Sequence, residues 1–264
     1  MLMDDLLSPV ALAVLVAVTS WWLGTGVILW LVRLPPRLFR TSMSGVTVLL
    51  LLSLAGTAWS MRQVSVAADY VGFICVILMW SWHEMAFLTG WLAGPRRIAL
   101  TPGLRGNARF GQSVMALLYH EVALLFNFGI LLALQQGQPN HVALCTYALL
   151  WCMRLSAKLN LFWGVPLLGE QYLPTSLSYL SSYFRVAPAG LGYMVLVTFS
   201  AGAWILLVSQ SSADSSTLSA AGLWLLATLW ALALLEHAMM ILPWPMQKLW
   251  GWALGSLKRT SPSC

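Results

Sequence analysis

Seven long apolar runs divide this chain, and each is about as long as the roughly 20 residues that a helix needs to cross a bilayer. The composition agrees, since 59% of the residues are hydrophobic and only 8% are charged, against about 25% charged in soluble domains. We therefore predict an all-α integral membrane protein, a single polytopic domain over residues 1–264. The expected spans are residues 8–32, 44–60, 69–93, 111–134, 141–158, 189–210 and 217–242.

Basic residues indicate how these spans are oriented. Thirteen of the 14 lysines and arginines fall at one set of span ends, and Arg62 is the exception. The positive-inside rule then predicts a periplasmic N-terminus and a cytoplasmic C-terminus, with an odd number of spans. The formal charge of +6 is explained by this asymmetry, so we expect contact with membrane lipid and none with nucleic acid.

The connector between the fifth and sixth spans, residues 159–186, is long and too apolar for a solvated loop. Glycines and prolines in its first part would break a helix. We expect an interfacial or re-entrant segment, in which Pro174 starts a short helix because proline suits a first helical turn. Leu177, Leu180 and Phe184 would share one apolar side of that helix, which would lie in the headgroup plane.

Paired glutamates and histidines are the main functional signal. Ionisable groups inside a membrane are costly and mark function by default. Three of the four glutamates adjoin three of the four histidines, and helical rise places the three pairs within about 7 Å of one depth in the cytoplasmic half. One site between the third, fourth and seventh helices is therefore expected, built from His83-Glu84, His120-Glu121 and Glu236-His237.

Three kinds of chemistry suit such a site. Carboxylates and imidazoles from facing helices ligate paired metal ions, most often iron, although the usual Glu-x-x-His spacing is absent here. Asn127, on the same face as His120, and Glu170, in the connector, are additional candidate ligands. The same groups would also suit a hydrogen-bonded or proton-carrying network, because a buried glutamate can take up a proton. The histidines alone would suit ligation of a chlorin or haem.

Two blocks of sequence resemble a known family. They are WHEMAFLTGWLAGPRR at residues 82–97 and KLNLFWGVPLLGEQYLPTSLSYLSSYF at residues 158–184. The Glu236-His237 pair, nearer the end of the chain, adds to the resemblance. Together they resemble the PuhE family of phototrophic bacteria, described as photosynthetic complex assembly protein 2. The resemblance implies a multi-pass protein of the bacterial inner membrane, cytoplasmic or intracytoplasmic. It implies no particular catalytic residues.

Two functions follow as expectations. The resemblance implies an assembly factor for the photosynthetic reaction centre and light-harvesting complex, acting through bacteriochlorophyll handling or supply. Its partners would be reaction-centre or light-harvesting subunits, or enzymes of pigment synthesis. The alternative, which rests on the paired residues, is a di-metal oxidoreductase acting on a hydrophobic substrate such as a pigment or isoprenoid. A transporter using the glutamates as a proton relay is a third hypothesis.

Overall fold

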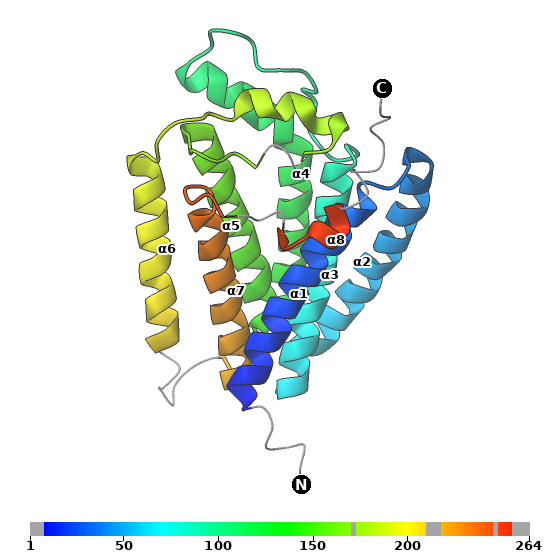
Figure 1. The fold of residues 1–264 in the computed structure, drawn as a ribbon. Coiled ribbons are helices and arrows are strands. Elements are labelled where there is room, and N and C mark those ends of the chain that lie inside the picture. Colours follow the sequence, from blue (N-terminus) through cyan, green and yellow to red (C-terminus); the bar gives the residue numbers. More distant parts are fainter. Residues whose placement is uncertain (1–7, 170–172, 210–217, 245–247, 255–264) are drawn as a thin grey trace.

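A bundle of seven long helices forms the protein, as the computed structural model shows for residues 8–169, 173–209, 218–244 and 248–254 (Figure 1). Each of the seven is long and apolar enough to cross a membrane, which confirms the predicted number of spans. The long helices are α1 (Pro9–Leu31), α2 (Phe39–Met61), α3 (Val66–Leu88), α4 (Gly106–Gln135), α5 (Val142–Trp163), α6 (Leu191–Ser209) and α7 (Ala220–Ala238). The short ones are η1 (Pro36–Leu38), η3 (Thr175–Tyr183) and α8 (Gly251–Leu254).

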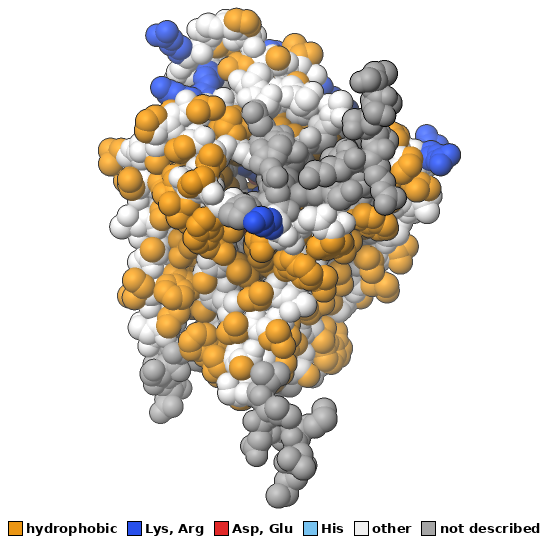
Figure 2. Space-filling view, in the orientation of Figure 1, with side chains coloured by type: hydrophobic (Ala, Val, Ile, Leu, Met, Phe, Trp, Pro, Cys, Tyr) orange, Lys and Arg blue, Asp and Glu red, His pale blue; other side chains and the backbone are white. Residues whose placement is uncertain are grey.

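Helix α3 is the centre of the bundle. It contacts α1, α2, α4, α5 and α7, whereas α6 lies at the edge and contacts α5 and α7. Phe73, Val76 and Met79 of α3 are fully buried. Large apolar side chains on the outer faces of the bundle remain exposed, as expected for a lipid-facing surface (Figure 2). The element that carries the first His-Glu pair is thus also the one around which the others pack.

Charge separates the two ends of the bundle. We call the two ends of the bundle upper and lower as they appear in Figure 1. Among the described basic residues, Arg62 alone follows the lower end of a helix. The others lie at the upper ends of the helices or in the loops that join those ends. Figure 2 shows apolar side chains over the middle of this face and basic side chains toward its upper end. The upper end is therefore the one that the positive-inside rule assigns to the cytoplasm.

Helix α3 ends earlier than the sequence suggested, at Leu88 instead of near residue 93. Gly90 has φ 81° and donates its N–H to the carbonyl of Phe87, and the N–H of Leu92 reaches the carbonyl of Ala86. A glycine in the left-handed region stops a helix in this way, because it carries no Cβ to clash. His83 and Glu84 consequently lie in the last turns of α3, nearer the upper end than predicted.

The connector after α5 folds across the upper end of the bundle. A short helix begins after Pro174, as predicted, but it is a 3₁₀ helix, η3. Its buried residues recur every third position, at Leu177, Leu180 and Tyr183, so Tyr183 takes the place expected for Phe184. The first part of the connector is held by backbone bonds, including one of 3.0 Å from Leu167 to the carbonyl of Met240.

A polar cluster joins three helices at the lower end. The carboxylate of Asp69, in the first turn of α3, accepts a 2.7 Å hydrogen bond from Nδ2 of Asn140, just before α5. It also accepts one from the hydroxyl of Ser219, which caps α7. Asp69 is buried, yet each of its oxygens has a donor, so its desolvation is offset. We call Asp69, Asn140 and Ser219 the Asp69 cluster.

Candidate functional site

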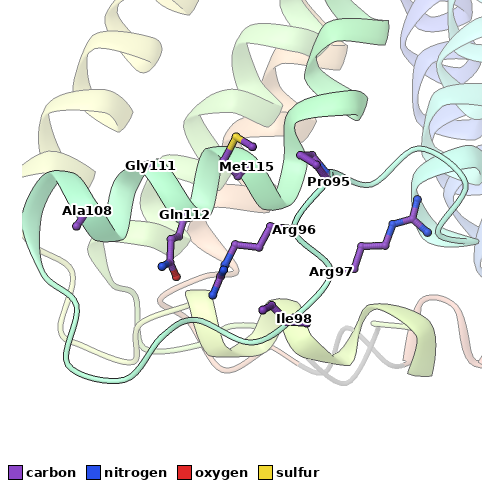
Figure 3. Close-up of a pocket in the computed structure, with 8 residues that line it drawn as sticks. All are labelled: Pro95, Arg96, Arg97, Ile98, Ala108, Gly111, Gln112 and Met115. Carbon is purple, nitrogen blue, oxygen red and sulfur yellow. The ribbon is translucent and has the colours of Figure 1, made fainter.

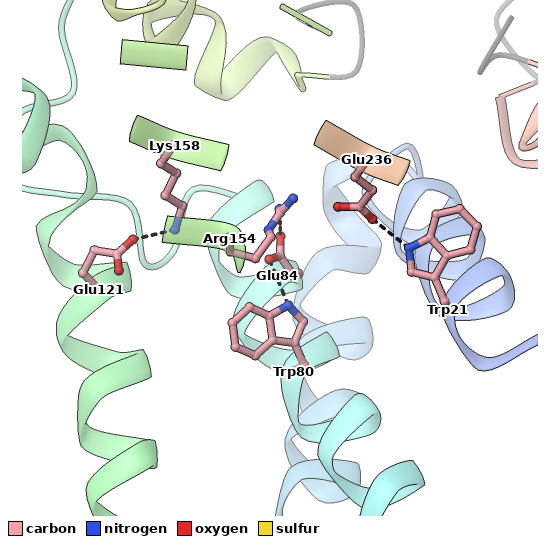
Figure 4. Close-up of polar contacts among 7 residues, drawn as sticks. All are labelled: Trp21, Trp80, Glu84, Glu121, Arg154, Lys158 and Glu236. Carbon is pink, nitrogen blue, oxygen red and sulfur yellow. Dashed lines mark hydrogen bonds and ion pairs between the residues drawn. The ribbon is translucent and has the colours of Figure 1, made fainter. Parts of the chain in front are cut away.

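The glutamates of the first two predicted pairs lie near the upper end of the bundle, where two cations from α5 contact them (Figure 4). Glu84 also interacts electrostatically with His120 of the second pair. We call this group the inner polar layer. It is formed by side chains of α3, α4 and α5, namely His83, Glu84, His120, Glu121, Arg154 and Lys158.

Glu84 is the more deeply buried carboxylate of the layer. Its side chain is 9% exposed, and Oε2 lies 3.0 Å from Nη2 of Arg154. The other oxygen accepts a 3.1 Å hydrogen bond from the indole N–H of Trp80, one turn earlier on α3. Both oxygens of the carboxylate are therefore engaged, and α3 is bound to α5 at this level.

Glu121 forms the second ion pair, with Lys158. Nζ of Lys158 lies 2.5 Å from Oε1, and the indole N–H of Trp151 lies 3.4 Å from Oε2. This pair binds α4 to α5. Arg154 and Lys158 are four residues apart on α5, so both point from one face of that helix toward the carboxylates. In the described part of the chain these two are the ion pairs that the structure contains.

The two histidines of the layer keep unused hydrogen-bonding capacity. Nε2 of His83 lies 2.9 Å from Nδ2 of Asn127. Nδ1 of His83 has no partner, and neither has Nδ1 of His120. The side chains are 3% and 1% exposed, and the His120 ring packs 4.6 Å from the ring of Phe87. Buried polar atoms without partners are unusual, which sets these rings apart from the ion pairs.

A backbone insertion fixes the position of His120. The carbonyl of Ala93 accepts the backbone N–H of His120 at 3.1 Å, and the carbonyl of Met115 accepts that of Arg96 at 3.4 Å. A Cβ on Gly94 would lie 2.1 Å from the carbonyl oxygen of Met115, so only glycine permits this approach. The first turns of α4 lie at an angle to the rest of the helix (Figure 3), as expected where a group inserts into the helical ladder.

The third predicted pair lies beside the layer and makes different contacts. Oε1 of Glu236 accepts a 2.7 Å hydrogen bond from the indole N–H of Trp21 on α1, and the carboxylate also interacts electrostatically with Arg154. Nε2 of His237 lies 2.9 Å from the hydroxyl of Ser156, and Nδ1 lies 2.8 Å from the carbonyl of Ala233. Both nitrogens of His237 are thus engaged, unlike those of the other two histidines.

These contacts bear on the metal hypothesis. Glu84 and Glu121 are each held by a cation and an indole N–H, and Glu236 is held by an indole N–H. Within the described residues, no group of three or more His, Cys, Asp or Glu side chains is arranged to hold a metal ion. Of the two additional candidate ligands, Asn127 lies beside His83, and Glu170 falls outside the described residues. The metal prediction therefore gains no support from this geometry.

Sequence reasoning missed the part played by Arg154 and Lys158. It treated both as markers of topology at the end of the fifth span. The available signal was their spacing of four residues within an apolar run, since two cations on one face of a membrane helix require counter-charges.

The fold and this layer define a polytopic α-helical membrane protein with a charge-compensated polar layer near one end. The chain belongs to the family described as "Protein of unknown function (DUF3623)", whose model matches residues 7–261. It is 39% identical over 254 residues to a protein of Rhodobacter capsulatus described as "Uncharacterized 30.4 kDa protein in puhA 5'region". That match covers 92% of each chain. No solved structure matches the chain.

Proposed function

We propose that this protein is an assembly factor for the photosynthetic reaction centre and light-harvesting complex, acting in the bacterial inner membrane. The observation that carries the proposal is the relative in the puhA 5' region, because such a position fits a photosynthesis gene cluster. The resemblance of residues 82–97 and 158–184 to the PuhE family supports the same function. The seven apolar helices fit a protein that works beside membrane-embedded subunits.

In this proposal the inner polar layer sets the relative positions of α3, α4 and α5. Its ion pairs hold the three helices at one level, and His83 and His120 supply polar atoms that the fold does not use. Removing the partner of the buried Glu84 would leave an uncompensated charge between the helices, so this ion pair favours one arrangement of α3 and α5. The layer thus gives the assembly factor a defined arrangement of three helices. It also provides two imidazole rings, each with a nitrogen that has no hydrogen-bond partner.

Bacteriochlorophyll handling is part of the predicted function, and the histidines are the groups that would ligate its magnesium. A free imidazole nitrogen is the right donor. The rings of His83 and His120 are almost fully buried, however, so the macrocycle would have to displace packed side chains such as Phe87. The residues as arranged do not fit a bound pigment at these rings, and we derive no step through it.

The alternative of a di-metal oxidoreductase is not favoured by the geometry. It needs Glu84, Glu121 and Glu236 as ligands, and each of them already accepts hydrogen bonds within the protein. Ligation of two ions would require release of the partners on α5. No observation favours the transporter hypothesis.

Deletion of the gene in the phototrophic bacterium that carries it tests the proposal. We expect lower amounts of assembled reaction-centre and light-harvesting complexes, measured by near-infrared absorbance of membranes, with restoration by the intact gene. Transcript levels of the complex subunits serve as the control, because an assembly factor acts after transcription. Unchanged complex levels in the deletion strain under phototrophic growth would contradict the proposal.

A further inference from the structure

A groove of about 580 Å³ lies at the upper end of the bundle, outside the inner polar layer (Figure 3). One wall is the loop that follows α3, and the other is the first three turns of α4. The lining side chains include Pro95, Arg96, Ile98, Gly111, Gln112 and Met115. We propose that this groove binds the headgroup phosphate of an anionic phospholipid, with Arg96 as its principal contact.

The charge of the groove is the first argument. Residues 85–119 contain four arginines and no acidic residue, and η3, which packs beneath them, has no acidic residue either. Arg154 in the polar layer is neutralised by Glu84. Among the described residues no carboxylate forms an ion pair with the arginines of the loop or of the start of α4, so this part of the molecule presents a positive potential to anions.

The contacts of Arg96 are the second argument. Its Nε donates to the hydroxyl of Tyr183 at 2.9 Å, and Nη2 donates to the carbonyl of Ala99 and the hydroxyl of Thr101 at 3.0 and 3.1 Å. All three acceptors are neutral, so the guanidinium is fixed in place and keeps its full charge. A fixed guanidinium loses little entropy on binding a phosphate, and the two N–H groups of Nη1, which take no part in these three contacts, can donate to phosphate oxygens.

A polar network holds the wall opposite Arg96. Gln112 of α4 accepts the backbone N–H of Thr101 at 3.1 Å and donates to its hydroxyl at 3.0 Å. Arg96 and Arg97 both line the groove, and Figure 3 shows the side chain of Arg96 extending toward Gln112 while that of Arg97 extends in another direction. Arg96 is therefore the arginine that lies nearer to Gln112.

Exposed apolar side chains beside the groove identify the occupant as a lipid and not as free phosphate. Ile98, Phe110 and Met115 are all exposed at the end of the membrane-spanning bundle. Acyl chains can cover such side chains while the headgroup stays at the level of Arg96. A lipid thus matches both halves of the surface, whereas an inorganic anion matches only the charged half. This inference goes beyond the proposed function and does not depend on it.

Lipid binding to the purified full chain in detergent tests the inference. Native mass spectrometry measures adducts formed with dioleoyl phosphatidylglycerol and with dioleoyl phosphatidylcholine. We expect tighter binding of phosphatidylglycerol, and an Arg96→Gln variant that binds it about fivefold more weakly, because one arginine near an anionic surface contributes about 1 kcal/mol. Binding of phosphatidylcholine should be the same in both proteins.

Two variants control for charge and for local structure. Arg40→Gln removes one charge from the same end of the bundle but outside the groove, and should leave phosphatidylglycerol affinity within about twofold of wild type. Arg96→Lys keeps the charge at this position while removing the same guanidinium contacts, and should weaken phosphatidylglycerol binding less than Arg96→Gln does. Equal losses in Arg96→Gln and either control would overturn the proposal. So would unchanged binding in Arg96→Gln, or displacement of the lipid by millimolar inorganic phosphate.

Discussion

The Asp69 cluster and the inner polar layer both bury carboxylates, but they satisfy them in different ways. The cluster at the lower end uses neutral donors, and both oxygens of its single carboxylate have a partner. The layer at the upper end uses two ion pairs and leaves a nitrogen of each of two imidazoles without a partner. Complete satisfaction is what stability alone requires.

The difference suggests a division of labour between the two ends. The Asp69 cluster joins the beginnings of α3, α5 and α7 and has the properties of a structural contact. The inner polar layer keeps hydrogen-bonding capacity that folding does not use, beside a helix bend that an inserted loop creates. We therefore assign a purely structural role to the Asp69 cluster and function to the unpaired imidazoles of the upper end. The following predictions test that assignment, from the largest expected effect on stability to the smallest.

Arg154→Leu should have the largest effect. It leaves the Glu84 carboxylate buried without a counter-charge, and we expect a loss of about 3 kcal/mol in the free energy of unfolding. Denaturation with SDS in mixed micelles measures this. The double variant Glu84→Gln/Arg154→Leu should recover most of the loss, because it removes both charges. A double variant as unstable as Arg154→Leu would show that the ion pair is not the cause.

Gly94→Ala should be next. The added Cβ would lie 2.1 Å from the carbonyl oxygen of Met115, so the inserted loop must shift, at a cost of about 2 kcal/mol. Thermal unfolding in detergent measures the change. Gly111→Ala is the matched control, because its Cβ would meet no atom within 4 Å. Equal melting temperatures for wild type and Gly94→Ala would contradict the described approach of the loop to α4.

Asp69→Asn should have an intermediate effect. The amide has one acceptor oxygen where the carboxylate has two, so either the Asn140 amide or the Ser219 hydroxyl loses the acceptor for its proton in a buried position, at a cost of about 1.5 kcal/mol. The same SDS titration measures it, and assembly of photosynthetic complexes should continue wherever the variant accumulates in the membrane. Loss of assembly at normal protein levels would give the lower end a functional role that our assignment denies.

His120→Leu should have the smallest effect on stability. It replaces an imidazole whose Nδ1 has no partner by an apolar side chain of similar size, which we expect to change the free energy of unfolding by about 0.5 kcal/mol or less. The melting temperature in detergent checks this. A large loss of stability would indicate that the ring makes an essential structural contact.

The sequence predicted the number and approximate limits of the helices, because the length of an apolar run is a local property. Its prediction for the end of α3 was wrong, since residues 89–93 are apolar but Gly90 adopts the left-handed conformation that stops a helix. The predicted position of η3 in the chain was correct, but the helix type was wrong, because buried residues recur every third position and not at the spacing of an α-helix. Leu177 and Leu180 fit both helix types, and only the third buried position, Tyr183, distinguishes them.

The candidate site was predictable in part. Proximity of the first two His-Glu pairs followed from their depths along α3 and α4. The carboxylates pair with Arg154 and Lys158 because of the face that α5 turns toward α3 and α4. The sequence of one membrane span does not show which of its faces will contact the neighbouring helices. The insertion of Gly94 beside α4 depends on contacts between separate segments of the chain. Asp69 was the first residue of the third predicted span, and its contacts with Asn140 and Ser219 were not predicted, although an acid at the start of an apolar run is itself a signal of a buried partner.

Complementation of the deletion strain with His120→Leu and with Asp69→Asn tests the central claim most directly. Near-infrared absorbance of the membranes reports assembled complexes, and immunoblotting reports the amount of each variant. Our account predicts that His120→Leu accumulates normally but restores little assembly, whereas the less stable Asp69→Asn restores assembly in proportion to its amount. Full restoration by His120→Leu, with failure of Asp69→Asn at normal protein levels, would contradict the assignment of function to the upper end.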